Sequence, residues 1–243
     1  MLEVKNLTKN FKNTKAVKEV SFTVNPGEIV GLLGENGAGK TTTMRMVSTL
    51  LKPSSGTVLV DGFDVIKEPE KVRKEIGILF GGDVGLYDRL TARENMLYFA
   101  NLYGFTKEEA DRRINELAEE LDMKEYIDKK VGKFSRGMKQ KVSIARSIVH
   151  SPSVMLFDEP TTGLDVRATR IIQNFIKKCK AENKTILFSS HSMSEVERLC
   201  DRVVIINKGE LIEEGTIEEL KKKHNNNDLE EVFVDLIGGE KDE

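Results

Sequence analysis

The feature that most constrains this chain is a glycine-rich turn that stands between a buried strand and a helix. Residues 28–34 (EIVGLLG) form a nearly continuous apolar run, which is typical of a strand buried on both faces. Residues 34–41 (GENGAGKT) then fit the pattern G-x-x-x-x-G-K-[S/T] at every fixed position. The segment that follows, TTTMRMVSTLL, has the pattern of a helix. This order of strand, loop and helix predicts a backbone that wraps around a phosphate group.

The chemistry of this loop favours the phosphates of a nucleoside triphosphate. Its glycines let backbone N–H groups point at phosphate oxygens, and the helix start adds the positive end of a dipole. Lys40 would neutralise the β- and γ-phosphates, and the Thr41 hydroxyl would ligate Mg²⁺. A glycine-rich turn with a chance lysine is the alternative, but the strand-loop-helix context disfavours it. The expected nucleotide-binding residues of this segment are Gly34, Glu35, Asn36, Gly37, Ala38, Gly39, Lys40, Thr41 and Thr42.

Two other apolar strands end in side chains that could act on a bound nucleotide. Residues 154–160 (VMLFDEP) end in two carboxylates. We expect Asp158 to hold Mg²⁺, directly or through water, and Glu159 to orient or deprotonate the attacking water. The alternative is that both acids merely cap the next segment. His191 follows the strand TILFSS, where it could reach the γ-phosphate or the water, and a purely structural histidine is the competing interpretation.

Strands and helices alternate on both sides of a helical middle section. Residues 93–150 read as amphipathic helices, and the residues after them read as buried strands separated by helices. Buried strands that alternate with helices predict a parallel α/β sheet. No apolar run approaches the ~20 residues that span a bilayer, so action on a membrane would need a partner that spans it. The net charge of -2 gives no reason to expect nucleic acid as a partner.

Three further segments narrow the class of nucleotide-binding protein. Residues 134–140 (FSRGMKQ) resemble the L-S-G-G-Q signature of ABC ATPases, residues 161–165 (TTGLD) resemble the D-loop, and Ser190–His191 resembles the switch histidine of that family. Order and spacing agree with the family up to about Gly215. The resemblance implies an α/β fold: a P-loop NTPase core with a mostly parallel sheet, an N-terminal antiparallel β lobe and an inserted α-helical subdomain.

The resemblance also implies domain limits and a mode of pairing. An ABC ATPase domain would cover residues 1–223, with its helical subdomain at about 88–150. Residues 224–243 would form a short C-terminal tail, with a short helix and a frayed end. Two such domains, expected as a homodimer, would pair head to tail, and each ATP would lie between the phosphate loop of one and the signature of the other. The residues assigned to the signature are Ser135, Arg136, Gly137 and Met138, and Asp165 is assigned to the D-loop.

The family pattern adds an adenine contact and a membrane partner. Phe11 aligns with the aromatic residue that stacks on adenine, although a core phenylalanine of the β lobe is the alternative. The cofactors implied are ATP and Mg²⁺. The partners implied are the second ATPase domain and an integral-membrane permease, with no nucleic acid. Such a chain is expected in the cytoplasm, peripheral on the inner face of the cell membrane.

The sequence departs from the family pattern at two places. In the signature, Phe134 replaces leucine and Arg136 replaces the first glycine. After the strand IGILF the family has a glutamine that touches Mg²⁺ and the water and faces the membrane partner. Here Gly81 or Gly82 stands at that position, depending on the side from which the spacing is counted. Glycine has no side chain to make either contact.

One branch of the family resembles this chain in particular. Residues 81–104 resemble ATPase subunits of the sodium-extruding Nat type, and residues 227–238 resemble the wider group of exporters. Na⁺ is therefore the expected cargo, with drugs, lipids or polysaccharide as alternatives. A soluble ABC ATPase of DNA repair or translation is less favoured, because the chain has no long coiled-coil insertion or second ATPase unit. A GTP-binding switch is disfavoured because residues 207–210 (NKGE) end in Glu where the guanine-reading motif has Asp.

Overall fold

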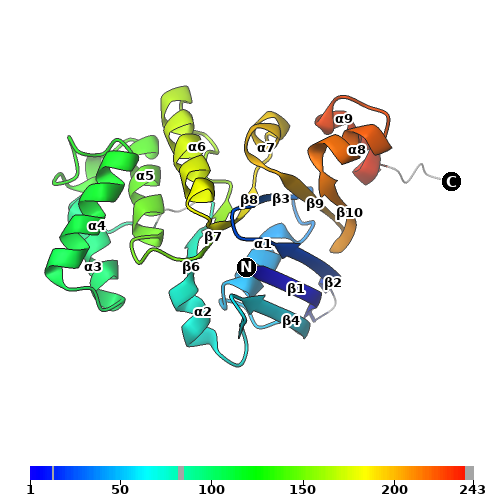
Figure 1. The fold of residues 1–243 in the computed structure, drawn as a ribbon, viewed down its shortest axis with the longest axis horizontal. Helices are drawn as coiled ribbons and strands as arrows, with labels where there is room; N and C mark the ends of the chain where they lie inside the picture. The colour runs from blue at the N-terminus through cyan, green and yellow to red at the C-terminus, as the bar shows by residue number, and fades with distance from the viewer. Residues whose placement is uncertain (13, 82–84, 239–243) are drawn as a thin grey trace.

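The computed structural model describes residues 1–12, 14–81 and 85–238, and two sheets with surrounding helices make up the molecule (Figure 1). The central sheet has the strand order β10-β9-β3-β8-β7-β6, and only the β10–β9 pair is antiparallel. The predicted mostly parallel sheet is thus confirmed. Its strands are β3 (Ile29–Leu33), β6 (Ile76–Leu79), β7 (Val154–Asp158), β8 (Thr185–Ser189), β9 (Arg202–Asn207) and β10 (Glu210–Thr216).

The second sheet is the antiparallel lobe that the family pattern predicts. Its strand order is β2-β1-β4-β5. Its strands are β1 (Leu2–Phe11), β2 (Thr14–Val24), β4 (Ser55–Val60) and β5 (Phe63–Asp64). Val20, Phe22 and Val24 are buried and alternate with more exposed residues, as a half-buried strand requires. The strand itself begins earlier than the alternation in residues 20–24 indicates.

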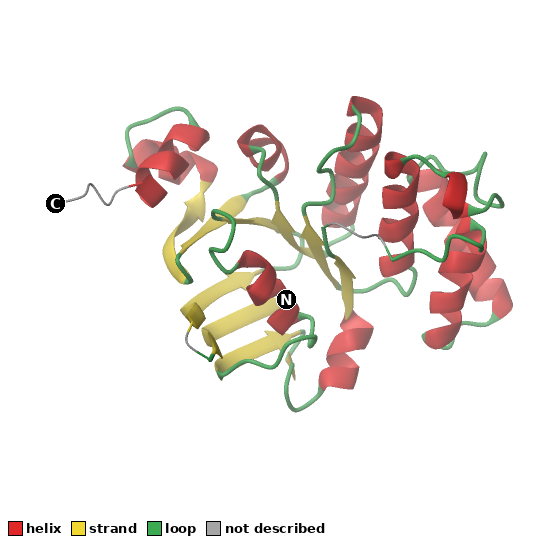
Figure 2. Cartoon of the chain, turned by 180° about the vertical axis from the view of Figure 1, so that it is seen from behind, coloured by secondary structure: helices red, strands yellow, loops and turns green. Residues whose placement is uncertain are grey.

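The helix α1 (Lys40–Val47) follows the phosphate loop and is held between the two sheets (Figure 2). Met44, Met46 and Val47 are fully buried in a core cluster that also contains side chains of both sheets. The helix is shorter than its apolar pattern suggests, because it ends before Leu50. Burial on two sides fixes the helix start, and with it the phosphate loop, relative to the central sheet.

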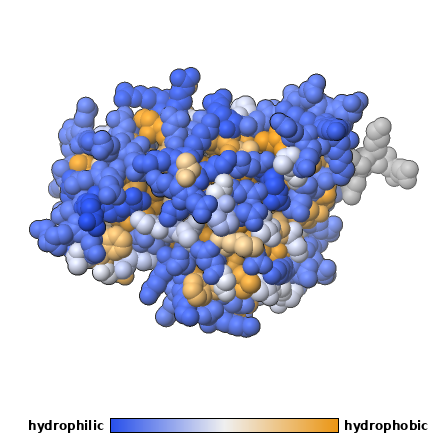
Figure 3. All heavy atoms as spheres, viewed as in Figure 1, coloured by the Kyte–Doolittle hydropathy of each residue, from blue (hydrophilic) through white to orange (hydrophobic). Residues whose placement is uncertain are grey.

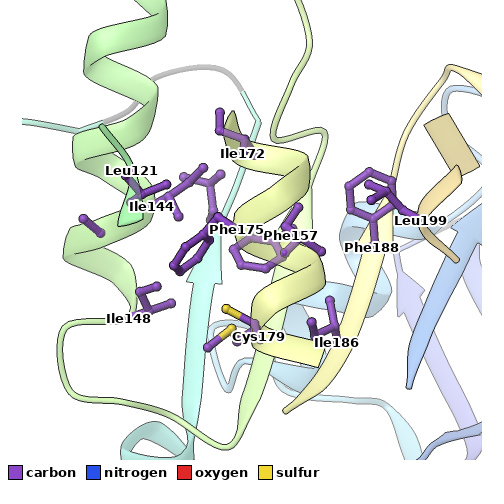
Figure 4. Close-up of a cluster of buried hydrophobic side chains, with 14 of the residues drawn as sticks. Leu121, Ile144, Ile148, Phe157, Ile172, Phe175, Cys179, Ile186, Phe188 and Leu199 are labelled. Carbon is purple, nitrogen blue, oxygen red and sulfur yellow. The ribbon is translucent and has the colours of Figure 1, made fainter. Parts of the chain in front are cut away.

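The helical middle section forms an arm beyond β6, which we call the helical arm. It contains α3 (Ala92–Leu102), α4 (Lys107–Glu120), the short 3₁₀ helix η1 (Val131–Lys133) and α5 (Arg136–Ser147). Thr91 and Thr106 begin α3 and α4 with reciprocal bonds to Glu94 and Glu109, so both helices start at capping boxes. Figure 4 shows the apolar core that joins this arm to the sheet: Ile144 and Ile148 of α5 lie near Phe175 and Phe157.

The remaining helices are α2 (Pro69–Glu75), α6 (Val166–Ala181), α7 (Met193–Leu199), α8 (Ile217–Lys223) and α9 (Leu229–Gly238). The helix expected after Asn225–Asn227 is α9. It packs on the molecule instead of standing apart, since Leu229, Val232 and Phe233 are buried. The frayed end of the predicted tail would follow this helix, and residues 239–243 lie outside the described residues.

The face drawn in Figure 3 is mainly hydrophilic, with small separate apolar areas. Across residues 1–12, 14–81 and 85–238, no helix combines the length and the apolar character that crossing a bilayer requires.

Candidate functional site

The phosphate loop has a backbone conformation that requires glycine directly before Lys40. Gly39 has a φ of 111°, which L side chains rarely adopt. A Cβ atom at Gly39 would also lie 2.7 Å from the carbonyl oxygen of Ala16. The loop therefore stays close to β2 and leads directly into α1, whose N-cap is Gly39.

Lys40 directs its ammonium group back into this loop. Its Nζ donates to the carbonyl oxygens of Gly34 at 2.6 Å and Glu35 at 3.0 Å, and the residue is 6% exposed. Desolvation lowers the pKa of Lys40, whereas the charges of Glu159, Asp158 and Glu35 act in the opposite direction. An ammonium group enclosed by the loop is well placed as the counter-charge of a phosphate.

Asp158 connects the phosphate loop to two strands of the sheet. It is 5% exposed, and its carboxylate accepts hydrogen bonds from Thr41 Oγ1 at 3.0 Å and from Ser189 Oγ at 2.6 Å. A hydroxyl beside a carboxylate is the oxygen-rich environment that Mg²⁺ prefers. In the described part of the chain, no group of three or more His, Cys, Asp or Glu side chains could hold a metal. Thr41 and Asp158 thus fit a Mg²⁺ ion that completes its ligands with phosphate oxygens and water.

Glu159 lies just beyond β7 in a strained conformation. Its φ is 51°, in the left-handed region that few residues other than glycine adopt. Its N–H lies 3.1 Å from both the carbonyl oxygen and the Oγ of Ser189, and its Oε2 accepts a hydrogen bond from Thr162 Oγ1 at 3.3 Å. Its Oε1 lies 2.6 Å from Nε2 of His191. Backbone strain held in place by several bonds is common at functional sites.

The register of the parallel strands explains why these side chains meet. Asp158 at the end of β7 is paired with Ser189 at the end of β8, and His191 follows two residues later. The strand β3, which leads into the phosphate loop, is the other neighbour of β8. The carboxyl ends of parallel strands share one edge of a sheet, which is where ligands of α/β proteins bind. The predicted phosphate, metal and water groups are therefore brought together at one edge.

The signature residues lie elsewhere, at the start of α5 in the helical arm. Ser135 is the N-cap of α5, and its Oγ accepts a hydrogen bond from the Met138 N–H at 3.2 Å. The signature segment thus lies at a helix start. Residues of the signature line one pocket, together with Asp165. Residues of the phosphate loop line another, together with His191.

Arg136 contacts the D-loop of its own chain. Gly163 has a φ of 72°, and a Cβ atom placed there would lie 2.4 Å from Nη1 of Arg136. The glycine leaves room for the guanidinium group, which therefore packs over the loop. Asp165 ends this loop as the N-cap of α6 and accepts a hydrogen bond from the Ala168 N–H at 2.8 Å.

The structure bears on two alternatives that the sequence left open, at Phe11 and at the position of the missing glutamine. Phe11 is 45% exposed at the end of β1, with Lys9 Nζ 5.0 Å from its ring centroid, so the alternative of a core phenylalanine is wrong. Gly81 lies beside the end of β7: a Cβ atom there would be 3.3 Å from the carbonyl oxygen of Asp158. Gly82, the other candidate for the missing glutamine, is outside the described residues.

Two residues that support the site were not found from the sequence. Ser189 binds the Asp158 carboxylate through its hydroxyl. Gln140 of α5 is buried, and its Nε2 donates to the carbonyl oxygen of Pro160 at 2.7 Å, which ties α5 to the loop after Glu159. Their only signal in the sequence is a polar residue on an apolar strand or helix face, which predicts burial of a polar group but no particular partner.

Comparison with known proteins agrees with this geometry. A family model described as "ABC transporter" matches residues 17–162. The ABC transporter ATP-binding protein NatA of Bacillus subtilis (strain 168) is 51% identical over 226 residues, which cover 93% of this chain and 92% of that protein. The bacitracin transport ATP-binding protein BcrA of Bacillus licheniformis is 40% identical over 225 residues, which cover 92% of this chain and 72% of that protein.

Solved structures show the same architecture. An ATP-binding subunit of an ABC transporter superposes with a TM-score of 0.89 at 32% identity, over 97% of this chain and 99% of that chain. A dimeric ATP-binding cassette in a post-hydrolysis state, bound to ADP and Pi, superposes with a TM-score of 0.80 at 28% identity, over 89% of this chain and 99% of that chain.

Proposed function

This chain belongs to the ABC transporter family as an ATP-binding subunit and an ATPase, and we propose that it powers export through a separate membrane permease. The observation that carries the proposal is the convergence of Lys40, Asp158, Glu159 and His191 at one edge of the central sheet. These groups supply a phosphate counter-charge, a metal ligand and a pair of side chains that can act on water.

The residues of the phosphate loop would hold the triphosphate of ATP. The N–H groups of residues 34–42 would bind its oxygens, and Lys40 would turn from the Gly34 and Glu35 carbonyls to the β- and γ-phosphates. The exposed ring of Phe11 would stack on adenine. Thr41 and Asp158 would hold Mg²⁺, which when bound neutralises charge on the β- and γ-phosphates.

Glu159 and His191 would act on the attacking water. The water oxygen bonds to the γ-phosphorus while the bond to the ADP oxygen breaks, and the water proton passes to the Glu159 carboxylate. His191, in contact with Oε1 of Glu159, fixes the direction of that carboxylate and can contact the γ-phosphate. The products are ADP and phosphate. Once the phosphate is released, no γ-phosphate joins the two domains.

The second half of each ATP site would come from another copy of the chain. The start of α5 offers N–H groups and the positive end of a helix dipole to phosphate. Its residues Ser135, Gly137 and Met138 line a pocket separate from that of the phosphate loop, which supports pairing of two chains head to tail. The solved cassette with ADP and Pi is dimeric, which is consistent with a homodimer here.

The permease would contact the helical arm. Tyr98 and Leu102 of α3 are exposed, as is Tyr87 just before this helix, and the rings of Tyr87 and Tyr98 meet edge to face with centroids 5.7 Å apart. Exposed aromatic side chains are enriched at protein interfaces. The chain would then sit in the cytoplasm, peripheral on the inner face of the cell membrane.

Na⁺ is the cargo that we propose, on the basis of the resemblance of residues 81–104 to the sodium-extruding Nat type. The similarity to a bacitracin transport protein makes an exported drug the second candidate. Reconstitution with a multi-helix membrane protein that co-purifies with this chain would test both. We expect ATP-dependent Na⁺ efflux from vesicles, and its loss with Glu159→Gln. Drug flux without Na⁺ flux would show that the cargo is a drug and not Na⁺. A chain that hydrolyses ATP but binds no permease would contradict the transport role.

A further inference from the structure

Glu195 of α7 is a buried carboxylate for which the site described above leaves no role. It is 5% exposed. Its carboxylate accepts hydrogen bonds from Ser190 Oγ at 2.6 Å and from Gln173 Nε2 at 2.9 Å, and Thr161 Oγ1 lies 2.8 Å from both of its oxygens. Each of these three partners is an uncharged side chain. The carboxylate is thus held by hydrogen bonds alone among the described residues.

The three partners come from three different segments of the site. Thr161 lies two residues after Glu159, and Ser190 lies directly before His191. Gln173 belongs to α6, the helix that begins at Asp165 of the D-loop. One carboxylate therefore joins the loop after β7 to the loop after β8. These are the loops whose side chains meet where Glu159 contacts His191.

The energetics explain why a carboxylate would hold the loops firmly. Burying a charge is unfavourable unless hydrogen bonds satisfy it, and hydrogen bonds to a charged acceptor are about twice as strong as neutral ones. The bonds from Thr161 and Ser190 must therefore be kept for Glu195 to stay buried. Both loops are irregular, and Glu159 is strained, so they need external support to keep one geometry.

We propose that Glu195 is a positioning residue for ATP hydrolysis, which fixes the loop of Glu159 and the loop of His191 relative to each other. The inference rests on the roles proposed above for Glu159 and His191. Glu195 does not touch the nucleotide in this account, and it acts through Thr161 and Ser190. Its loss should leave ATP bound in a site whose carboxylate and imidazole are misaligned.

Glu195→Gln is the direct test, because it keeps the size of the side chain. Glutamine has one acceptor oxygen, so its NH₂ group replaces one of the two carboxylate oxygens that accept hydrogen bonds from Gln173, Thr161 and Ser190. We expect kcat for ATP to fall at least about 10-fold while KM changes by less than about threefold, since small misplacements can reduce rates by about 100-fold. ATP-dependent dimerisation, measured by gel filtration, should be preserved.

The control is Glu197→Gln on the same helix. Glu197 pairs with Lys221 at the surface, away from both loops. This variant should keep the kcat and KM of the unchanged protein, and its thermal unfolding should match that of Glu195→Gln to within a few degrees. Ser190→Ala and Thr161→Val remove the same bonds from the other side. When either substitution is combined with Glu195→Gln, the double variant should lose less activity than the sum of the two single effects on the activation free energy predicts.

Each outcome decides the inference. A Glu195→Gln variant with normal kcat, beside an inactive Glu159→Gln variant, overturns the positioning role and leaves the proposed function intact. A raised KM with unchanged kcat overturns it as well. If Glu195→Gln unfolds, normal turnover of both Ser190→Ala and Thr161→Val overturns it, and reduced kcat in both supports it. Normal turnover of Glu159→Gln overturns the inference together with the hydrolytic roles on which it rests.

Discussion

Nε2 of His191 lies 2.6 Å from Oε1 of Glu159, although the two residues follow different strands. The contact exists because Asp158 and Ser189 are paired at the ends of β7 and β8. Glu159 and His191 can therefore act as one unit on a water molecule near the phosphate loop. In the proposed mechanism, this contact distinguishes a hydrolytic site from a site that only binds the nucleotide.

Glu159→Gln should bind ATP and fail to hydrolyse it. Glutamine keeps the shape of the side chain but cannot accept the water proton, so we expect kcat to fall about 100-fold or more. The variant should then accumulate as an ATP-bound dimer, which gel filtration with and without ATP would detect. Turnover at the normal rate would remove Glu159 from the mechanism.

Lys40→Ala should weaken MgATP binding. The substitution removes the buried ammonium group that lies within the phosphate loop, and hydrogen bonds to charged groups contribute about 1.5–3 kcal/mol, or roughly 10- to 100-fold in affinity. Isothermal titration with a non-hydrolysable ATP analogue would measure the change. Lys52→Ala is the matched control, because Lys52 is an exposed lysine outside the loop. Equal affinities of the two variants would contradict the role of Lys40.

The ATPase rate per chain should rise with protein concentration. The signature at Ser135 and the phosphate loop line separate pockets, so a complete site would require two chains. Steady-state assays over a dilution series would show the dependence. Mixing Lys40→Ala with Ser135→Glu should also restore activity above that of either variant alone, because one site of the mixed dimer is intact. A constant rate per chain down to high dilution, with no gain on mixing, would refute the shared site.

The stability of the fold should decrease between about pH 6.5 and pH 4 through His150. Its ring stacks on Tyr103 with centroids 3.8 Å apart, and its Nε2 lies 3.1 Å from the Ile76 carbonyl oxygen. Desolvation lowers the pKa of His150 to about 4. The unfolded chain, in which a histidine has a pKa of about 6.5, therefore takes up a proton before the folded chain does as the pH falls. The free energy of unfolding should decrease by up to about 3 kcal/mol over this interval.

His150→Phe isolates this effect, because it keeps an aromatic ring against Tyr103 and cannot titrate. Urea unfolding at about pH 7, 6 and 5 should give the variant a flatter dependence of unfolding free energy on pH than the unchanged protein. Carboxylates contribute equally to both proteins, so the difference in slope belongs to position 150. Parallel slopes would show that His150 titrates normally in the folded chain.

The sequence by itself determined the parts of this protein that are local. The phosphate loop and the apolar strand directly before Glu159 each depend on a few neighbouring residues. Backbone conformation, burial pattern and helix capping act over that range, so a pattern of residues is enough to predict them. The mostly parallel sheet and the antiparallel lobe followed from the same patterns together with the family resemblance.

Only the tertiary structure decided which of these parts meet. The order β8-β7-β6 in the sheet brings His191, which follows β8, to Glu159, and it places Gly81, which follows β6, beside the end of β7. The packing of Arg136 over Gly163, and the bonds that Glu195 receives from Thr161 and Gln173, depend on folding of segments far apart in the chain. Apolar periodicity specifies which face of a strand or helix is buried, but not the partner against which it is buried. That choice is made by the packing of the whole core.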